Sequence, residues 1–200
     1  MNPILSSSLN SAIATNQLSL TSFKPLYVDQ VSGLLDAAFG ADRHNKSSYK
    51  LRETCQDIPE LSQVVLHNDG DKPSIIAATI AFSQMQVGNA KALLLGPLAV
   101  DANFRGQGLG HYLMAATINQ AIARAKVNAK ADRWQFIILI GDLDYYAKIG
   151  FKRVPLGALD YPQPTDPNRI LYLDIANNGL HNLMSQTKLP MLLNKPNFKG

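Results

Sequence analysis

Three glycines at alternate positions stand between an apolar stretch and a long helix-like run. They lie in residues 104–110 (FRGQGLG), directly after LLLGPLAV and DAN. Glycine costs about 1 kcal/mol relative to alanine inside a helix, so glycines here indicate a special backbone conformation or a close approach to the main chain. The segment therefore predicts a strand, a tight loop and a helix in succession.

This loop lies where a phosphate group could bind. A helix amino terminus exposes main-chain N–H groups and carries a partial positive charge, and glycines before it let a phosphate approach the backbone. The loop is therefore interpreted as a pyrophosphate cradle, with Arg105 and Gln107 as assisting side chains. A glycine-rich turn that only starts the helix is the alternative interpretation.

Two other phosphate-binding motifs fit poorly. The dinucleotide-binding motif needs G-x-G-x-x-G, whereas Gly106, Gly108 and Gly110 are spaced by two and two. The P-loop ends in Gly-Lys-Ser/Thr, whereas Gly110 is followed by His111 and Tyr112. The spacing thus argues against a protein that binds NAD or ATP.

Composition narrows the class of protein. The chain has 200 residues, 46% hydrophobic and 17% charged, which is typical of a globular domain with a sizeable core. The longest apolar runs are far shorter than the roughly 20 residues of a membrane-spanning helix. The amino terminus has neither a basic region nor a continuous apolar core, so no secretory signal is expected.

The content of cysteine, charged residues and histidine narrows the class of protein further. Cys55 is the only cysteine, so an internal disulfide is excluded and a reducing cytoplasm is expected. The net charge of +4 is compatible with an anionic ligand and with an ordinary solvated surface. The basic residues do not cluster as nucleic-acid binding requires. The four histidines are scattered, so no metal site is expected.

Hydrophobic periodicity predicts an α/β protein with a mixed sheet. Strands 74–87 and 90–101 are linked by a hairpin turn, and a long helix after the glycine loop leads by a parallel crossover to strand 133–141. Further strands are expected at 17–24, 60–67, 151–155 and 170–176, and further helices at 28–40, 45–55 and 142–150. The expected organisation is an N-terminal tail (1–15), a domain (16–175) and a C-terminal extension (176–200).

Local signals refine these elements. Asp29 is expected to cap the helix at 28–40, and Gly40 to end it. Gly96 and Pro97 fall inside strand 90–101. Because proline donates no ladder hydrogen bond, the pair predicts a bulge or a local break in pairing.

Three segments resemble the GNAT N-acetyltransferase superfamily. Residues 105–110 (RGQGLG) match its acetyl-CoA motif R/Q-x-x-G-x-G/A, and the flanking LGPLAVDANF and LIGDLDYYAKIGF also resemble GNAT sequences, in particular a bacterial branch of N-acetyltransferases. The resemblance covers about residues 18–154. Three matching segments in the right order are much more specific than the six-residue motif alone.

The resemblance implies a fold and a cofactor site. The fold would be a mixed, mostly antiparallel central sheet flanked by helices, with a splayed parallel strand pair that holds acetyl-CoA. Its pantetheine contacts map onto the main chain of Leu98 and Val100, where the bulge at Gly96 would open the cleft. The pyrophosphate would be held at Arg105, Gly106, Gln107, Gly108, Leu109 and Gly110.

The resemblance also points to a general acid. The family places a tyrosine four residues before Gly-Phe, and Tyr146 has this position here. A tyrosine of ordinary pKa about 10 is protonated at neutral pH and can donate to a departing thiolate. Tyr145 is expected to point elsewhere, and Tyr146 as an ordinary packed residue is the alternative.

The region before this tyrosine departs from the family pattern. Gly141 and Asp142 stand where many members have an asparagine that contacts pantetheine, which puts that contact in doubt. Asp142 and Asp144 are interpreted as residues of the helix start.

No general base is identified. Glu53, Glu60, His67 and His111 are conceivable, but each is interpreted as a structural or solvated group. The acceptor side is expected in the first two helices and the loop between them. The basic residues there either bind an anionic group or belong to a solvated loop; they are Arg43, His44, Lys46 and Lys50.

These observations predict an N-acetyltransferase that moves an acetyl group from acetyl-CoA to a primary amine by direct attack in a ternary complex. The amine belongs to a small molecule or a protein. A non-catalytic acyl-CoA-binding or sensor protein on the same fold is the alternative. The segment from the proline-rich loop to Gly200 is expected either to shape the acceptor site or to form a homodimer interface. Nucleic-acid, membrane and metal partners are not expected.

Overall fold

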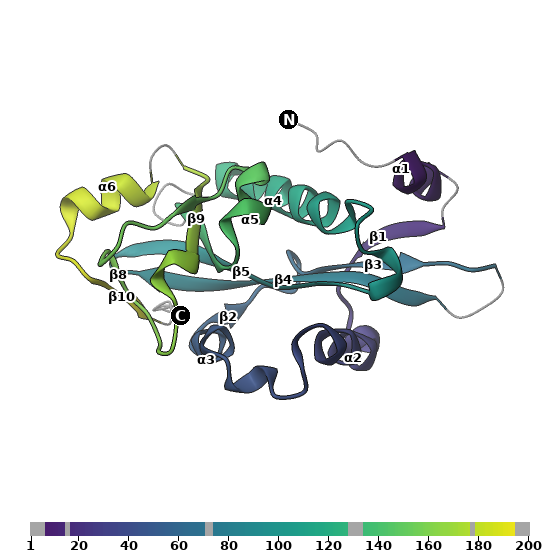
Figure 1. Ribbon diagram of the computed structural model, residues 1–200. Coiled ribbons are helices and arrows are strands. Elements are labelled where there is room, and N and C mark those ends of the chain that lie inside the picture. Colours follow the sequence, from purple (N-terminus) through teal and green to yellow (C-terminus); the bar gives the residue numbers. More distant parts are fainter. Residues whose placement is uncertain (1–6, 15–16, 71–73, 128–133, 177–178, 195–200) are drawn as a thin grey trace. The chain divides into compact units, whose positions relative to one another are not determined.

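The computed structural model describes residues 7–14, 17–70, 74–127, 134–176 and 179–194 (Figure 1). Contacts between Cα atoms divide the chain into two compact units, each built from three stretches of sequence. The first comprises Met1–Arg43, Ile58–Phe82 and Gly96–Ala121, and the second His44–Asp57, Ser83–Leu95 and Ile122–Gly200.

The first unit contains antiparallel strands. Its elements are α1 (Ser7–Ala14), β1 (Leu18–Ser22), α2 (Val28–Phe39), β3 (Gln63–His67), the first part of β4 (Ile75–Val87), the last part of β5 (Ala90–Val100) and most of α4 (Leu109–Val127). Strand β3 pairs antiparallel with β1 and with β4, and the β3–β4 register shifts between Val65 and Leu66.

Helices α2 and α4 cover opposite faces of these strands. Val64 packs in one core cluster with Leu34 and Leu35 of α2. Its neighbour Gln63 instead donates from Nε2 to Oε1 of Gln120 on α4. Successive residues of a strand point to opposite faces, so the two helices lie on different sides, as Figure 1 shows.

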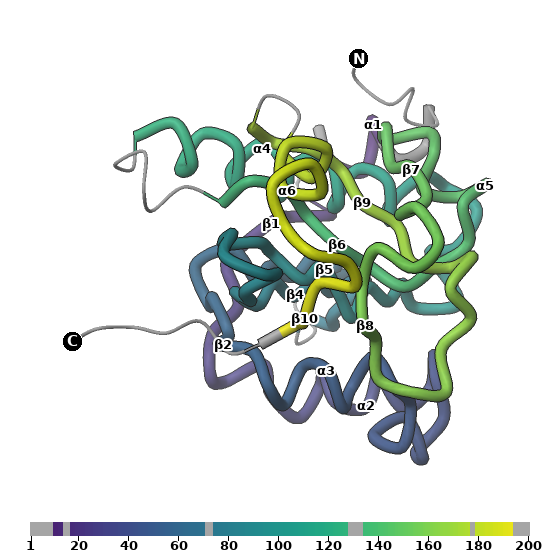
Figure 2. Tube along the Cα trace, turned by 90° about the vertical axis from the view of Figure 1, so that its left-hand side faces the viewer, coloured from purple at the N-terminus to yellow at the C-terminus, as the bar shows by residue number. Residues whose placement is uncertain are grey.

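The second unit holds the parallel strand pairs. Strands β5 and β6 (Phe136–Ile140) pair in parallel at Leu93–Ile137 and Leu94–Ile138, and β9 (Ile170–Asp174) runs antiparallel to β6 and to β7 (Lys152–Arg153). The short strands β8 (Leu159–Asp160) and β10 (Met191–Asn194) also pair in parallel and lie side by side (Figure 2). The other elements are α3 (Ser47–Glu53), β2 (Gln56–Asp57), α5 (Leu143–Tyr146) and α6 (Gly179–Gln186).

The hydrogen-bonded strand order is β1-β3-β4-β5-β6-β9-β7, to which β4 and β5 contribute in both units. It confirms the expected mixed, mostly antiparallel sheet with flanking helices. Four elements lie where the sequence predicts none: α1, β2, β8 and β10. Helix α6 likewise lies in the segment that was expected only as an extension.

The start of α2 differs from its prediction, and its end agrees. A 3₁₀ turn at Pro25–Tyr27 runs directly into the helix, so Tyr27 occupies the N-cap position and Asp29 lies in the first turn. Gly40, with φ 89°, ends the helix as expected, and its N–H donates to the main-chain oxygen of Asp36 at 2.9 Å. Among the described helices, none combines the length and the apolar character needed to cross a membrane.

Candidate functional site

Strand β5 changes backbone conformation just after its parallel pairing with β6. The last paired residue is Leu94, and Gly96 follows with φ 125°, a value that a regular strand does not adopt. This agrees with the irregularity expected at Gly96. Further on, Ala99 is buried against α2, whereas Leu98 and Val100, which alternate with it, are half-buried on the other side of the strand.

The segment that follows β5 is fixed at its beginning. The N–H of Asp101 donates to the Ala77 oxygen on β4 at 2.9 Å, and its carboxylate accepts from the N–H of Asn103 at 2.9 Å. The Phe104 ring lies 5.0 Å from the imidazole of His67. These contacts position the glycine loop on the strands of the first unit.

The two polar side chains of the loop fold back onto the main chain that precedes it. Arg105 donates from Nε to the Val100 oxygen at 3.1 Å, and Gln107 donates from Nε2 to the Asn103 oxygen at 3.2 Å. Arg105 is exposed, so its charge lies at the surface of the loop.

The glycines adopt the conformations that the loop requires. Gly106 and Gly108 have φ of 75° and 89°, in the left-handed region where L side chains are strained. Helix α4 begins directly afterwards, and the N–H of Tyr112 donates to the Gly108 oxygen at 3.0 Å. The N–H groups of Leu109 and Gly110 lie in the first turn, where a helix supplies no main-chain acceptor. The loop thus presents the positive end of α4, as an anion site requires.

Tyr146 lies in the second unit, at the end of α5. Its ring contacts Phe151 with a centroid distance of 5.8 Å and Tyr145 with one of 5.0 Å, both edge to face. In this single helical turn the neighbouring rings of Tyr145 and Tyr146 touch, although Tyr145 is the more exposed of the two. Burial is the main cause that raises the pKa of Tyr146 to about 12. The nearby Tyr145 and Asp142 also raise it, and the positive charge of Arg169 opposes them. The phenol is accordingly protonated at neutral pH.

Asp142 and Asp144 lie at the start of α5, as expected. Asp142 occupies the N-cap position without a side-chain cap and forms an ion pair with Arg169, whose Nε is 3.2 Å from its carboxylate. The N–H of Gly141 donates to the Arg169 oxygen at 2.9 Å. Two contacts therefore hold the end of β6 to the residue preceding β9.

The candidate bases have the ordinary surroundings that the sequence suggests. Glu53 and Glu60 are exposed, and the His67 imidazole packs against Phe104. His111 is half-buried in the first turn of α4. No general base is assigned among them.

Arg43 was expected among the basic residues that bind an anionic group or lie in a solvated loop, but it is buried. It is only 5% exposed, and it donates to Asp36 at 2.7 Å and to Ser32 at 2.9 Å. Its charge is therefore compensated within the first unit, where it ties the loop to α2.

The sequence did not reveal a short chain of polar hydrogen bonds around the buried Ser83 in the second unit. Arg52 on α3 donates from Nη1 to Ser83 at 3.2 Å, and Ser83 donates to Asp57 at 2.7 Å. Burial lowers the pKa of Arg52 from its usual value, against the raising effect of Asp57. A charged residue on a short helix gives no sequence signal that it will bond to a strand residue 31 positions further along the chain.

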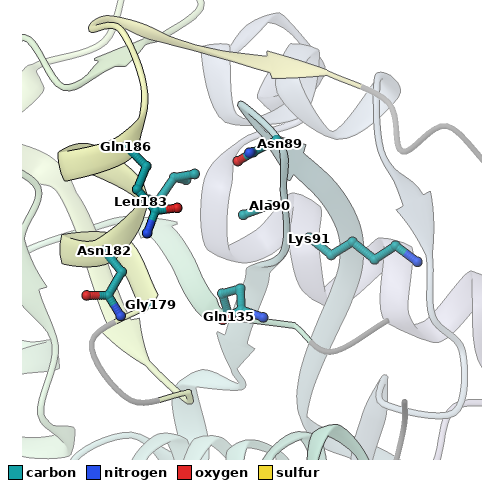
Figure 3. Close-up of a pocket in the computed structure, with 8 residues that line it drawn as sticks. All are labelled: Asn89, Ala90, Lys91, Gln135, Gly179, Asn182, Leu183 and Gln186. Atoms are coloured by element: carbon teal, nitrogen blue, oxygen red, sulfur yellow. The ribbon is translucent and has the colours of Figure 1, made fainter. Parts of the chain in front are cut away.

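A pocket of about 300 Å³ in the second unit lies at the amino ends of β5 and β6 (Figure 3). Amide side chains dominate its lining, which consists of Asn89, Ala90, Lys91, Gln135, Gly179, Asn182, Leu183 and Gln186. None of the candidate site residues lines it. Within the described part of the chain, no group of three or more His, Cys, Asp or Glu side chains could hold a metal ion.

A family model matches part of the chain. Residues 63–153 match the family model described as acetyltransferase (GNAT) domain, a stretch that includes both the glycine loop and Tyr146. No curated protein matches the chain.

Solved structures share the fold. The GNAT family N-acetyltransferase YhbS from Escherichia coli, in complex with CoA, is 18% identical with a TM-score of 0.62, over 98% of this chain and 93% of that one. A GNAT family acetyltransferase from Brucella melitensis, in complex with acetyl-CoA, is 20% identical with a TM-score of 0.54, over 80% and 89%. A chain of the NatC complex bound to Gag peptide and CoA is 20% identical with a TM-score of 0.56, over 79% and 98%.

Proposed function

We propose that the chain, whose residues 63–153 match the GNAT acetyltransferase model, is a GNAT enzyme that transfers an acetyl group from acetyl-CoA to a primary amine. The observation that carries the proposal is the glycine loop: it has left-handed glycines directly before a helix, inside the stretch that matches the family. Similar folds have been solved with CoA and with acetyl-CoA, which supports the same cosubstrate here.

The proposed cofactor site has two parts. Main-chain groups of Leu98 and Val100 on β5 hold the pantetheine arm. The first-turn N–H groups of Leu109 and Gly110, together with the loop glycines, hold the pyrophosphate. Arg105 and Gln107 release their hydrogen bonds to the main-chain oxygens of Val100 and Asn103 and turn their donors to the phosphates. An arginine forms charge-assisted hydrogen bonds with a phosphate.

The proposed chemistry is direct attack in a ternary complex. The amine nitrogen forms a bond to the thioester carbonyl carbon, and the carbon–sulfur bond breaks. The Tyr146 hydroxyl, which is protonated at neutral pH, gives its proton to the leaving sulfur. The attacking amine loses a proton to a base, by way of water.

The acceptor belongs to a class rather than to one compound. A chain of similar fold has been solved with a bound peptide, which supports protein amines as well as small amines. A cytoplasmic location completes the proposal, and the C-terminal segment either shapes the acceptor site or forms a homodimer interface.

Calorimetric titration with acetyl-CoA, with NAD and ATP as controls, tests the cosubstrate. Saturable binding of acetyl-CoA alone is expected; a folded protein that binds none would overturn the proposal. A panel of amines with detection of free CoA then tests catalysis. Tight binding without CoA release from any amine would instead favour the non-catalytic acyl-CoA sensor.

A further inference from the structure

Gly141, at the end of β6, lies directly against the ring of Tyr146. A Cβ atom built on Gly141 overlaps with Cε2 of Tyr146 and stands 2.8 Å from its Cδ2. It also stands 3.0 Å from Cδ1 of Leu139. The ring therefore occupies the space in which every other amino acid would carry its side chain.

The ring has little room to move away. Tyr145 packs on it at 5.0 Å and Phe151 at 5.8 Å between centroids. The main chain of Gly141 is held by its hydrogen bond to the Arg169 oxygen, at 2.9 Å. A methyl group at residue 141 would consequently disturb the position of the ring and its contacts with Tyr145 and Phe151.

We propose that Gly141 is a positioning residue, whose missing side chain sets where the Tyr146 hydroxyl lies. The inference rests on the proposed role of Tyr146 as general acid. A rotation about the Cα–Cβ bond moves the hydroxyl farther than any other atom of the side chain, because the hydroxyl lies at its far end. Proton transfer depends steeply on that position, because a displacement of about 1 Å can cost on the order of 100-fold in rate.

The test compares Gly141→Ala with Asn119→Ala. Asn119 lies exposed in the third turn of α4, past the glycine loop, so its variant should keep full activity. Gly141→Ala should lower kcat by about 10- to 100-fold, with KM for acetyl-CoA within about twofold. In the Tyr146→Phe background it should cause little further loss, since there is no hydroxyl left to misplace. Equal kcat in the wild type and a folded Gly141→Ala protein would overturn the inference.

A second measurement does not depend on the folding of that variant. The Hα resonances of Gly141 should be shifted by the ring current of Tyr146, and the shift should vanish in Tyr146→Leu. Unshifted resonances would overturn the contact itself. If Tyr146→Phe keeps full activity, the proposed acid is wrong; if it loses activity and Gly141→Ala does not, only the positioning role is wrong.

Discussion

The side chain of Arg105 reaches back to the strand that precedes it, and its Nε donates to the main-chain oxygen of Val100 at 3.1 Å. This bond joins two segments to which we assign different parts of acetyl-CoA: β5 for the pantetheine arm and the glycine loop for the pyrophosphate. Binding of the cofactor should therefore exchange one acceptor of Arg105 for another.

Arg105→Ala should weaken acetyl-CoA binding moderately. The side chain is exposed, so its ion pair with a phosphate is screened, and we expect a loss of about three- to tenfold that shrinks as salt is added. Titration at low and high salt measures this. Arg153→Ala, which removes an exposed arginine from β7, is the matched control and should leave the affinity unchanged. An equal loss in both variants would show an effect of net charge only.

Gly108→Val should abolish acetyl-CoA binding. The residue has φ 89°, where a β-branched side chain is strongly disfavoured, and the added atoms would fill the proposed cradle. Calorimetry is expected to give no saturable binding, and far-UV circular dichroism should remain that of the wild type. A folded variant with unchanged affinity would remove the loop from the cofactor site.

Tyr146→Phe should lower kcat by about 10²- to 10⁴-fold, the usual range for loss of a general acid. The dissociation constant for acetyl-CoA should stay within about twofold, because the ring is retained. Tyr145→Phe keeps the neighbouring ring contact and should remain active. Comparable losses in the two variants would argue that packing, and not proton donation, explains the effect.

The stability of the protein should fall in alkaline solution. The pKa of Tyr146 is raised from about 10 in the unfolded chain to about 12 in the folded one. The folded state thus holds the proton more tightly, so the stabilisation is complete below pH 10 and is lost as the pH rises to 12. Urea unfolding across this window should show a smaller decline for Tyr146→Phe. The same decline in both proteins would contradict the shift.

Long periodic elements were accessible from the sequence because many residues report on each of them. In α4, Met114, Ile118 and Ala121 repeat at helical spacing and are all buried, as predicted. The strands on either side of the glycine loop were also found, since continuous apolar runs fix them. Two-residue strands such as β2 and β8 have no period to detect, and only their partners define them.

Contacts between side chains were harder to predict from the sequence than the long helices and strands. Nothing local in the sequence reveals that Arg43 is compensated by Asp36, or that Gly141 and Tyr146 share one space. At Gly141 the sequence showed only a departure from the family pattern. The structure supplies a reason, because the tyrosine ring stands where an asparagine side chain would have to be.

The approach of α6 to β6 bears on how the chain could be shortened. A Cβ at Gly179 would stand 2.6 Å from the Gln135 oxygen, so the helix is seated on the strand end without a spacer. Leu180 and Leu183 then enter the same core cluster as Phe136. A chain that ended at residue 176 would expose this apolar cluster to solvent, where proteases and chaperones recognise it. Natural truncations upstream of α6 should therefore be selected against.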